Sequence, residues 1–295
     1  MGGLLGGRVP PAEMFPAGRP DLRTRYLELA SGLRVRAVEA GKESDPTIVL
    51  IPGWGCSVYI FRENFAALAA AGFHPVAVDL KGHGLSDKPL APGEYRLEAM
   101  RTHVAEIIDA LQLDHVMLTG LSMGSALAAH YAFLEPRRVQ GLVMVSPVGF
   151  SGLPGLSVLR MVTPAPLAPI APRIASRSLV RAFLRTVNGK LRRITERDVD
   201  EYWAPTQFPE FTLAMRQLLH EFNWRAPFVP LPVPTLLITG THDRLLLSRH
   251  AESYTRLMPL MEHIVVKDAG HVVYDEAAPI VNAAMIEFFS QFRHL

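Results

Sequence analysis

The sequence predicts an α/β fold with a mostly parallel sheet, helices on both faces and an inserted helical cap. Two observations support this prediction. Short, continuous apolar runs alternate with longer segments of helical spacing over most of the 295 residues, and one stretch that is first Pro-rich and then helical interrupts the alternation. Strands that alternate with helices are typical of right-handed βαβ crossovers, which cover both faces of a sheet.

The chain is expected to begin with an extension and a hairpin. Residues 1–22 are rich in Gly, Pro and Arg, and we expect a flexible N-terminal extension there. Residues 25–30 and 33–38 flank Ser31-Gly32 and show partial alternation of apolar and polar side chains. This pattern predicts an antiparallel hairpin at the edge of the sheet.

The core of the predicted fold consists of residues 23–149 and 229–295. Apolar runs typical of buried parallel strands lie at residues 47–51, 75–80, 115–119, 139–145, 234–239 and 263–266. Helical spacing predicts helices at residues 61–71, 97–111, 125–134, 248–257 and 279–292. Ligands of such sheets bind at the carboxyl ends of the strands, so functional residues are expected there.

Residues 150–228 separate two predicted strands and are interpreted as the helical cap. Its first helix is expected to begin near Pro172 and to end at Asn188-Gly189. The apolar residues of this helix share one face: Ile174, Val180, Phe183, Leu184 and Val187. The other side has a basic stripe, defined by Arg173, Arg177, Arg181 and Arg185. We interpret the stripe as a solvated face, and attraction of an anionic lipid or substrate is the alternative.

The composition is that of an ordinary globular protein, with 49% hydrophobic and 20% charged residues. A net charge of +2 gives no reason to expect a nucleic-acid partner. Cys56 is the only cysteine, which excludes an intramolecular disulfide and argues against a cysteine-based metal site. The sequence has neither a secretory signal pattern nor an uncharged apolar run of about 20 residues, so a cytoplasmic location is expected.

A serine lies between two glycines at the junction of a predicted strand and a predicted helix. The segment Gly120-Leu-Ser122-Met-Gly124 follows the apolar run that ends at Thr119. In this setting Gly-x-Ser-x-Gly is typical of a nucleophile elbow, a turn whose strained serine costs about 1–3 kcal/mol and whose glycines avoid collisions between strand and helix. The sequence therefore predicts Ser122 as a catalytic nucleophile, with a helix N-terminus that favours developing negative charge.

A serine hydroxyl needs a base within reach and a carboxylate that orients the base. After an elbow the expected chain order is Ser, then Asp or Glu, then His. His271, in a turn after the last apolar run, is the predicted base, and Asp243, just beyond the run at 234–239, is the predicted acid. Asp268 is the alternative acid, but it lies three residues before His271 and is expected to shape that turn.

Two backbone N–H groups are predicted to stabilise the oxyanion of the reaction. One belongs to Met123, directly after the nucleophile, and the other to the loop Pro52-Gly53-Trp54-Gly55, at Trp54. Cys56 is close to this loop and is expected to be a small buried thiol rather than a reactive group.

The segment from Asp79 to Asp87 contains a further aspartate and histidine, Asp79 and His83, in a Gly-rich turn. We interpret this turn as structural rather than as a second catalytic pair. Gly82-x-Gly84 lacks the third glycine of a dinucleotide-binding fingerprint, and no segment matches a P-loop, so no nucleotide cofactor is expected.

Together these segments resemble the α/β-hydrolase superfamily, in particular its cap-bearing serine esterases and lipases. The resemblance extends from about residue 23 to the C-terminus and rests on segments 52–55, 79–86, 120–124, 240–243 and 270–271, in the family's order. It implies an eight-stranded, mostly parallel sheet. One departure concerns the oxyanion loop, which commonly opens His-Gly in the family and opens Pro52-Gly53 here.

The predicted function is hydrolysis of a carboxylic ester through an acyl-enzyme on Ser122, without a metal or organic cofactor. The apolar cap favours a small or medium hydrophobic ester, a lactone or a monoacylglycerol. Carbon–carbon, amide or perhydrolysis chemistry on the same triad is the alternative among enzymes, although Val272 replaces the aromatic residue that often follows the histidine of carbon–carbon hydrolases.

Two further hypotheses concern ligand binding and membranes. Some superfamily members are receptors that keep the triad, so a ligand-binding role is an alternative from a different class. A lipase that works at a membrane surface is a variant of the first hypothesis, motivated by the basic stripe.

Relatives with an aspartate at the elbow are dehalogenases or epoxide hydrolases, and Ser122 argues against both activities.

Overall fold

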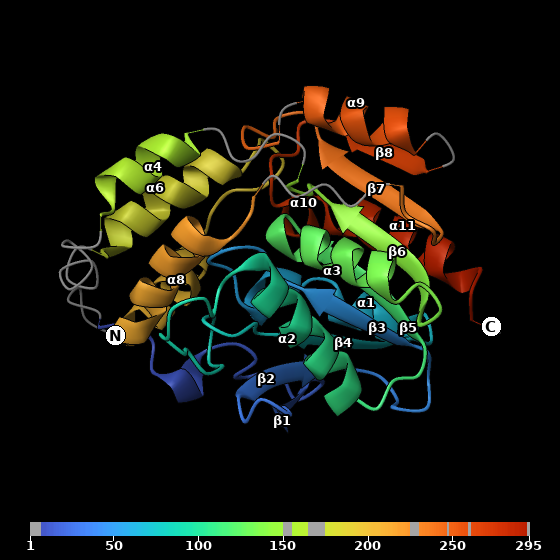
Figure 1. Ribbon diagram of the computed structural model, residues 1–295, viewed down its shortest axis with the longest axis horizontal. Coiled ribbons are helices and arrows are strands. Elements are labelled where there is room, and N and C mark those ends of the chain that lie inside the picture. Colours follow the sequence, from blue (N-terminus) through green and yellow to red (C-terminus); the bar gives the residue numbers. More distant parts are fainter. Residues whose placement is uncertain are drawn as a thin grey trace.

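An eight-stranded sheet forms the centre of the computed structural model, which describes residues 7–149, 155–164, 175–224, 230–246, 248–258 and 261–293 (Figure 1). The strands are β1 (Arg23–Glu28), β2 (Arg34–Glu39), β3 (Thr47–Ile51), β4 (His74–Val78), β5 (Val116–Leu121), β6 (Val139–Val145), β7 (Thr235–Gly240) and β8 (Glu262–Val266). Their order across the sheet is β1-β2-β4-β3-β5-β6-β7-β8. Only β2 is antiparallel to its neighbours, which confirms the predicted mostly parallel sheet and the hairpin at its edge.

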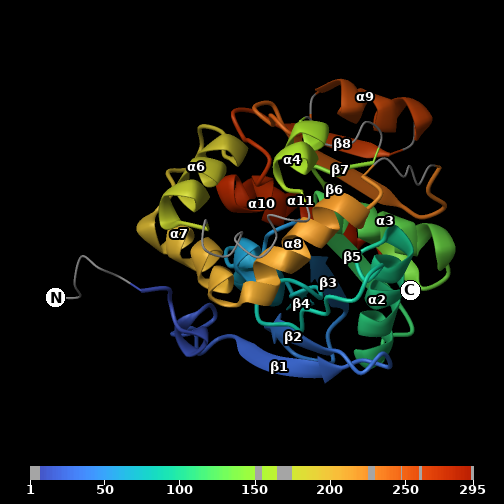
Figure 2. The same cartoon turned by 60° about the vertical axis from the view of Figure 1, so that its left-hand side comes forward.

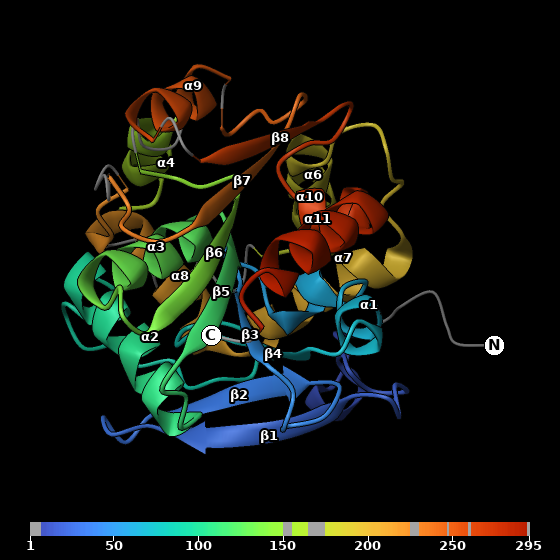
Figure 3. The same ribbon diagram turned by 90° about the vertical axis from the view of Figure 1, so that its right-hand side faces the viewer.

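Helices cover both faces of this sheet, as predicted (Figure 3). The helices and single turns of the core are η1 (Pro11–Glu13), η2 (Val58–Phe61), α1 (Phe65–Ala70), α2 (Leu97–Ala110), α3 (Met123–Leu134), α9 (Ser248–Leu257), α10 (Val273–Glu276) and α11 (Ala278–Ser290). Side chains of α2, α3 and α9 pack on one face, and those of α1, α10 and α11 pack on the other. In α2, Leu97, Met100, Val104 and Ile107 are buried at the three- and four-residue spacing of a helix with one apolar face.

The sequence located the strands and helices of the core to within a few residues. Strands β3 and β6 have the predicted bounds, and so does helix α9. The predicted helix at 61–71 differs, because the structure divides this region into η2 and α1. Ser57 accepts the N–H of Tyr59 and starts a separate turn, so the apolar residues before Phe65 are buried without belonging to the helix.

A helical region lies between β6 and β7 in the chain and beside one end of the sheet (Figures 1 and 2). Its described elements are α4 (Leu156–Val162), α6 (Arg177–Val187), α7 (Glu196–Trp203), η4 (Ala204–Gln207) and α8 (Pro209–Glu221). This region is consistent with the predicted inserted cap. Its predicted limits at residues 150 and 228, and the helix start expected near Pro172, lie outside the described residues.

Helix α6 begins at Arg177, where Ser176 accepts the N–H of Leu179. Its arginines pair within the cap: Arg177 lies 2.6 Å from Asp200 and 2.7 Å from Glu196 of α7, and Arg181 pairs with Glu196. Two of the four arginines of the basic stripe are thus engaged with carboxylates, while Arg185 is exposed and Arg173 lies outside the described residues. These ion pairs give Arg177 and Arg181 partners within the protein, which makes both less available to the anionic lipid or substrate of the alternative.

Residues 7–22 pack against the rest of the molecule, unlike the free extension expected from their composition. Met14 and Phe15 are buried. The Phe15 N–H donates to Glu201 of α7 at 2.8 Å, and the Phe15 carbonyl accepts from Arg36 of β2 at 2.9 Å. Two apolar side chains in a segment dominated by Gly, Pro and Arg are enough to dock it between the cap and the sheet, while residues 1–6 lie outside the described part of the chain.

Candidate active site

Ser122 occupies the one-residue turn between β5 and α3. Its backbone angles are φ +54° and ψ −112°, a conformation that side chains rarely adopt and that costs about 1–3 kcal/mol. The Ser122 N–H donates to the Val145 carbonyl of β6 at 2.9 Å, which ties the turn to the neighbouring strand. The chain therefore changes from strand to helix within a single strained residue, as an elbow requires.

The glycines on both sides of Ser122 are required by close backbone contacts. A Cβ atom on Gly124 would lie 2.1 Å from the Ile51 carbonyl oxygen, and one on Gly120 would lie 2.5 Å from the Gly124 carbonyl carbon. The buried Ser125 hydroxyl lies 2.9 Å from both the N–H and the carbonyl oxygen of Val145. Helix α3 is thereby held directly against β3, β5 and β6.

The structure brings Asp243 and His271 together from separate loops. Asp243 follows β7, and its Oδ1 accepts the backbone N–H groups of Leu245 at 2.8 Å and Leu246 at 2.7 Å. Its Oδ2 lies 2.8 Å from His271 Nδ1, and both side chains are buried. Because a carboxylate only accepts hydrogen bonds, we assign the imidazole proton to Nδ1, which leaves Nε2 as the basic atom.

The electrostatics of this pair keep Asp243 ionised. Burial by itself would raise the pKa of Asp243, but the charge of His271, their hydrogen bond and the two backbone donors hold it below its usual range. The backbone N–H of His271 donates to the Val187 carbonyl at the end of α6 at 2.8 Å. The imidazole is thus oriented by its ionised partner, while the backbone of His271 is tied to the end of α6.

Asp268, the alternative acid, lies elsewhere. Its carboxylate is 3.6 Å from His242 Nδ1 and 3.8 Å from Lys190 Nζ, and its backbone has φ +63°. Its carbonyl oxygen accepts the Lys190 N–H at 2.8 Å. Asp268 therefore shapes the turn before His271, as expected.

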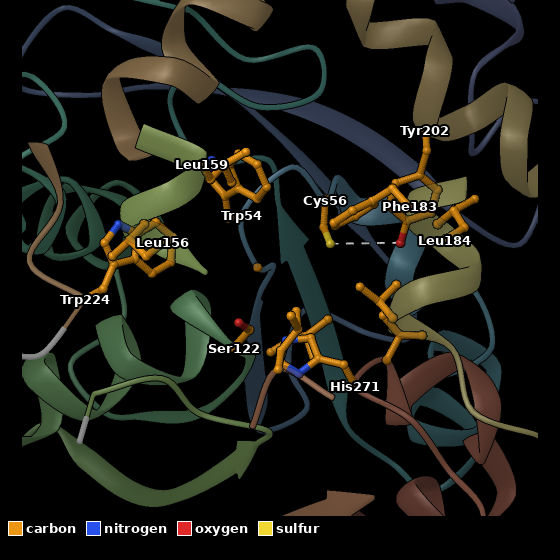
Figure 4. A pocket seen from close by; sticks show the side chains of 15 residues that line it. Trp54, Cys56, Ser122, Leu156, Leu159, Phe183, Leu184, Tyr202, Trp224 and His271 are labelled. Atoms are coloured by element: carbon orange, nitrogen blue, oxygen red, sulfur yellow. Dashed lines mark hydrogen bonds between the residues drawn. The ribbon is translucent and has the colours of Figure 1, made fainter. Parts of the chain in front are cut away.

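Ser122 and His271 line one cavity beneath the cap, and Figure 4 shows the Ser122 hydroxyl beside the imidazole. The cavity volume is about 110 Å³, several times the roughly 10–15 Å³ that a cavity needs to hold one water molecule. Most of its wall is apolar, and about half of the lining residues belong to the helical region between β6 and β7, among them Leu156, Leu159, Phe183, Leu184, Val187 and Trp224.

The loop after β3 passes over the nucleophile. A Cβ atom on Gly53 would lie 3.3 Å from Ser122 Cβ, so the Gly53-Trp54 backbone is next to the serine. The Trp54 indole donates to the Met215 carbonyl of α8 at 3.1 Å and packs edge-on against Phe183. Met123 is the first residue of α3, and N–H groups in the first turn of a helix lack intrahelical acceptors.

Asp79 and His83, the second Asp and His noted in the sequence, make contacts that hold the local backbone in place. Asp79 pairs with Arg36 at 2.7 Å and accepts the N–H groups of Val58 and Leu85, each at 2.8 Å. Burial lowers the pKa of His83 to about 4, and its Nδ1 lies 3.1 Å from the Lys81 carbonyl. These contacts agree with the interpretation of segment 79–87 as a structural turn.

The structure also reveals a carboxylate that the sequence analysis did not single out. Glu276 of α10 is buried and accepts the Gly270 N–H at 2.9 Å and the Gly189 N–H of the cap at 2.7 Å. It joins the loop of His271 to the end of α6. No sequence motif marks it, and its position five residues after His271 is the only available signal.

Comparison with known proteins decides the family. The profile of the alpha/beta hydrolase fold family matches residues 46–278. The chain belongs to this family. Membership in the alpha/beta hydrolase fold family confirms the resemblance inferred from the motifs and agrees with the eight-stranded sheet.

Relatives within the alpha/beta hydrolase fold family differ in activity. The chain is 25% identical over 282 residues to Lipase 1 of Psychrobacter immobilis, covering 89% of this chain and 83% of that protein. It is 24% identical over 323 residues to bifunctional epoxide hydrolase 2 of Sus scrofa, covering 95% of this chain and 57% of that protein. The crystal structure of a membrane phospholipase A superposes with a TM-score of 0.79 at 23% identity, covering 93% of this chain and 88% of that one, which shows a common fold.

Within the part of the chain that the structure describes, no three His, Cys, Asp or Glu side chains gather where they could hold a metal ion. None of the described helices combines the length and the hydropathy needed to cross a bilayer.

Proposed function

We propose that this alpha/beta hydrolase cleaves carboxylic esters through an acyl-enzyme on Ser122. The observation that supports this proposal most strongly is the 2.8 Å contact between Asp243 and His271 Nδ1, where His271 lines the same cavity as the strained Ser122. A buried, ionised carboxylate fixes the tautomer of the imidazole and stabilises its protonated form during catalysis.

The proposed reaction has two halves, formation of the acyl-enzyme and its hydrolysis. His271 Nε2 accepts the Ser122 proton while Oγ attacks the ester carbonyl carbon, and the N–H groups of Met123 and Trp54 stabilise the oxyanion. The intermediate collapses by breaking the carbon–oxygen bond, and His271 gives its proton to the leaving alkoxide. Water, deprotonated by His271, then attacks the acyl carbon, and the collapse of the second intermediate releases the acid and restores the Ser122 hydroxyl.

The cavity supports a small or medium hydrophobic ester as the substrate. A volume of about 110 Å³ fits a short acyl chain better than a long one, and the apolar wall stabilises a hydrocarbon chain by removing it from water. Similarity to a lipase supports ester chemistry. Ser122 argues against epoxide opening, because the epoxide-opening members of the superfamily place an aspartate at the elbow.

The test combines turnover and labelling. A series of p-nitrophenyl esters from acetate to dodecanoate should be hydrolysed with a preference for the shorter chains. The Ser122→Ala variant should lower kcat by at least about 1,000-fold, and the exposed Ser31→Ala variant provides a matched control. A fluorophosphonate probe should modify Ser122 when peptides are analysed by mass spectrometry. Modification of a different residue, or no turnover of any ester, would contradict the proposal.

A further inference from the structure

The cavity contains a second polar pair, formed by Tyr202 of α7 and Cys56 of the loop after β3. The Tyr202 hydroxyl oxygen lies 3.9 Å from the Cys56 sulfur, and both residues line the cavity of Ser122 (Figure 4). Figure 4 shows the pair on the opposite side of the Trp54 loop from the labelled Leu156 and Trp224. The proposed ester chemistry does not use this pair.

The hydroxyl of Tyr202 has a poor hydrogen-bond partner. Within the described residues the Cys56 sulfur is its only one, and a thiol sulfur accepts weakly. Burial raises the pKa of Cys56 to about 11 and raises the pKa of Tyr202 well above its usual value, so both groups keep their protons near neutral pH. An O–H donor that lines an apolar cavity and has only a weak acceptor gains free energy when a better acceptor arrives.

The ring that presents this hydroxyl is held firmly. Tyr202 packs edge-on against Tyr59, with ring centroids 6.2 Å apart and an interplanar angle of 86°. The Tyr59 hydroxyl donates to Asp198 at 2.8 Å, and Asp198 pairs with the buried Arg62 at 3.1 Å. Since these contacts fix Tyr202 before any ligand binds, its hydroxyl needs only to rotate its proton to change partners.

We propose that Tyr202 and Cys56 form a polar subsite that binds an acceptor oxygen, as in an ether or a ketone, within the chain of an otherwise apolar ester. The proposal rests on the proposed ester hydrolysis and names its substrate class more closely. On binding, the Tyr202 O–H turns from the sulfur to the substrate oxygen, and the thiol loses only a weak contact. A chain that has a methylene at this position leaves the hydroxyl with its poor partner.

The test compares p-nitrophenyl hexanoate with analogues in which an ether oxygen replaces one methylene at successive positions. Rates are divided by those of alkaline hydrolysis to remove intrinsic reactivity. One analogue should have a kcat/KM about three- to tenfold above that of hexanoate, as one hydrogen bond provides. In Tyr202→Phe the ratio of kcat/KM for this analogue to that for hexanoate should fall to near one. In the control Tyr26→Phe, which removes an exposed tyrosine hydroxyl outside the cavity, the ratio should stay.

Two variants of Cys56 are expected to affect the ratio of kcat/KM differently. They keep the proposal testable if Tyr202→Phe folds poorly. Cys56→Ala removes the competing acceptor and should keep or raise the ratio, whereas Cys56→Ser supplies a stronger acceptor for Tyr202 and should lower it. Two results would overturn the subsite alone: hexanoate turnover without preference for any ether analogue, or the same ratio of kcat/KM in Tyr202→Phe as in wild type. Absence of all ester turnover would overturn the proposed function together with the subsite.

Discussion

Two regions of the molecule are held by different forces. The elbow of Ser122 is built from backbone contacts, where Gly124 lies too close to the Ile51 carbonyl for any side chain. The junction between cap and core is built from buried charges: Arg62 pairs with Asp198 of α7 and Asp275 of α10, and Arg192 pairs with both carboxylates at 2.8–3.0 Å. We call Arg62, Arg192, Asp198 and Asp275 the ionic junction.

The difference predicts how each region fails. The elbow fails when a side chain forces strand and helix apart, whatever the charge of that side chain. The ionic junction fails when one charge is removed, because the opposite charges remain buried without a partner. Since Asp275 lies four residues after His271, the junction connects the stability of the cap to the loop of the proposed base.

The largest effect is expected from Arg62→Met. The substitution keeps much of the volume but leaves Asp198 and Asp275 with fewer cations, and loss of one partner from a buried network costs about 3–5 kcal/mol. Urea unfolding followed by circular dichroism measures the loss.

The matched control is Arg181→Met, which removes an arginine from the exposed pair with Glu196. Exposed pairs contribute little because solvent screens them, so this variant should unfold close to wild type. Equal losses in the two variants would refute the contrast between buried and exposed pairs. Adding Asp198→Asn and Asp275→Asn to Arg62→Met should recover part of the stability.

A smaller effect on stability, with a large one on activity, is expected from Gly124→Ala. The new methyl group meets the Ile51 carbonyl at 2.1 Å, so the elbow must shift. Overpacking of this kind costs about 1–3 kcal/mol, and a displacement of about 1 Å at a reacting group lowers kcat/KM by about 100-fold.

The control for the elbow is Gly32→Ala in the hairpin turn. Gly32 has a positive φ, +80°, and a Cβ there meets no atom within 4 Å. Only backbone strain of about 1 kcal/mol is expected, with ester turnover preserved. If both alanine variants kept full activity, close packing at Gly124 would not be what holds Ser122 in place.

The same contrast explains what the sequence could predict. Strands β3 and β6 were located to the residue because each is a continuous apolar run. The glycines of the elbow, Gly120 and Gly124, are visible in the sequence motif itself, and the structure shows that a side chain at either position would collide with the backbone. The proximity of Asp243 and His271 followed from chain order at successive strand ends. Local patterns therefore predicted the backbone-held region well.

The charge-held region could not be predicted in this way. Arg62 is 136 residues from Asp198 and 213 from Asp275, and no local pattern records which distant charges meet. The same is true of Tyr202 and Cys56, which are 146 residues apart. The docking of Phe15 on Glu201 was missed for a related reason. A composition rich in Gly, Pro and Arg predicted a flexible segment, whereas the buried Met14 and Phe15 and the hydrogen bond from the Phe15 N–H to Glu201 hold it in place.

The smallest effect concerns pH and the pair of Asp243 with His271. The pKa of Asp243 is lowered in the folded protein, so its interactions stabilise the fold above the unfolded pKa of about 3.9. This contribution is lost as pH falls through the lower folded value. The difference in free energy of unfolding between wild type and Asp243→Asn should therefore be constant near neutral pH and shrink below about pH 4. Asp21→Asn, at an exposed pair with Arg19, should change little over the same range. A difference that stays constant down to acid pH would mean that the charge of Asp243 contributes nothing to folding and that its backbone hydrogen bonds alone hold the loop.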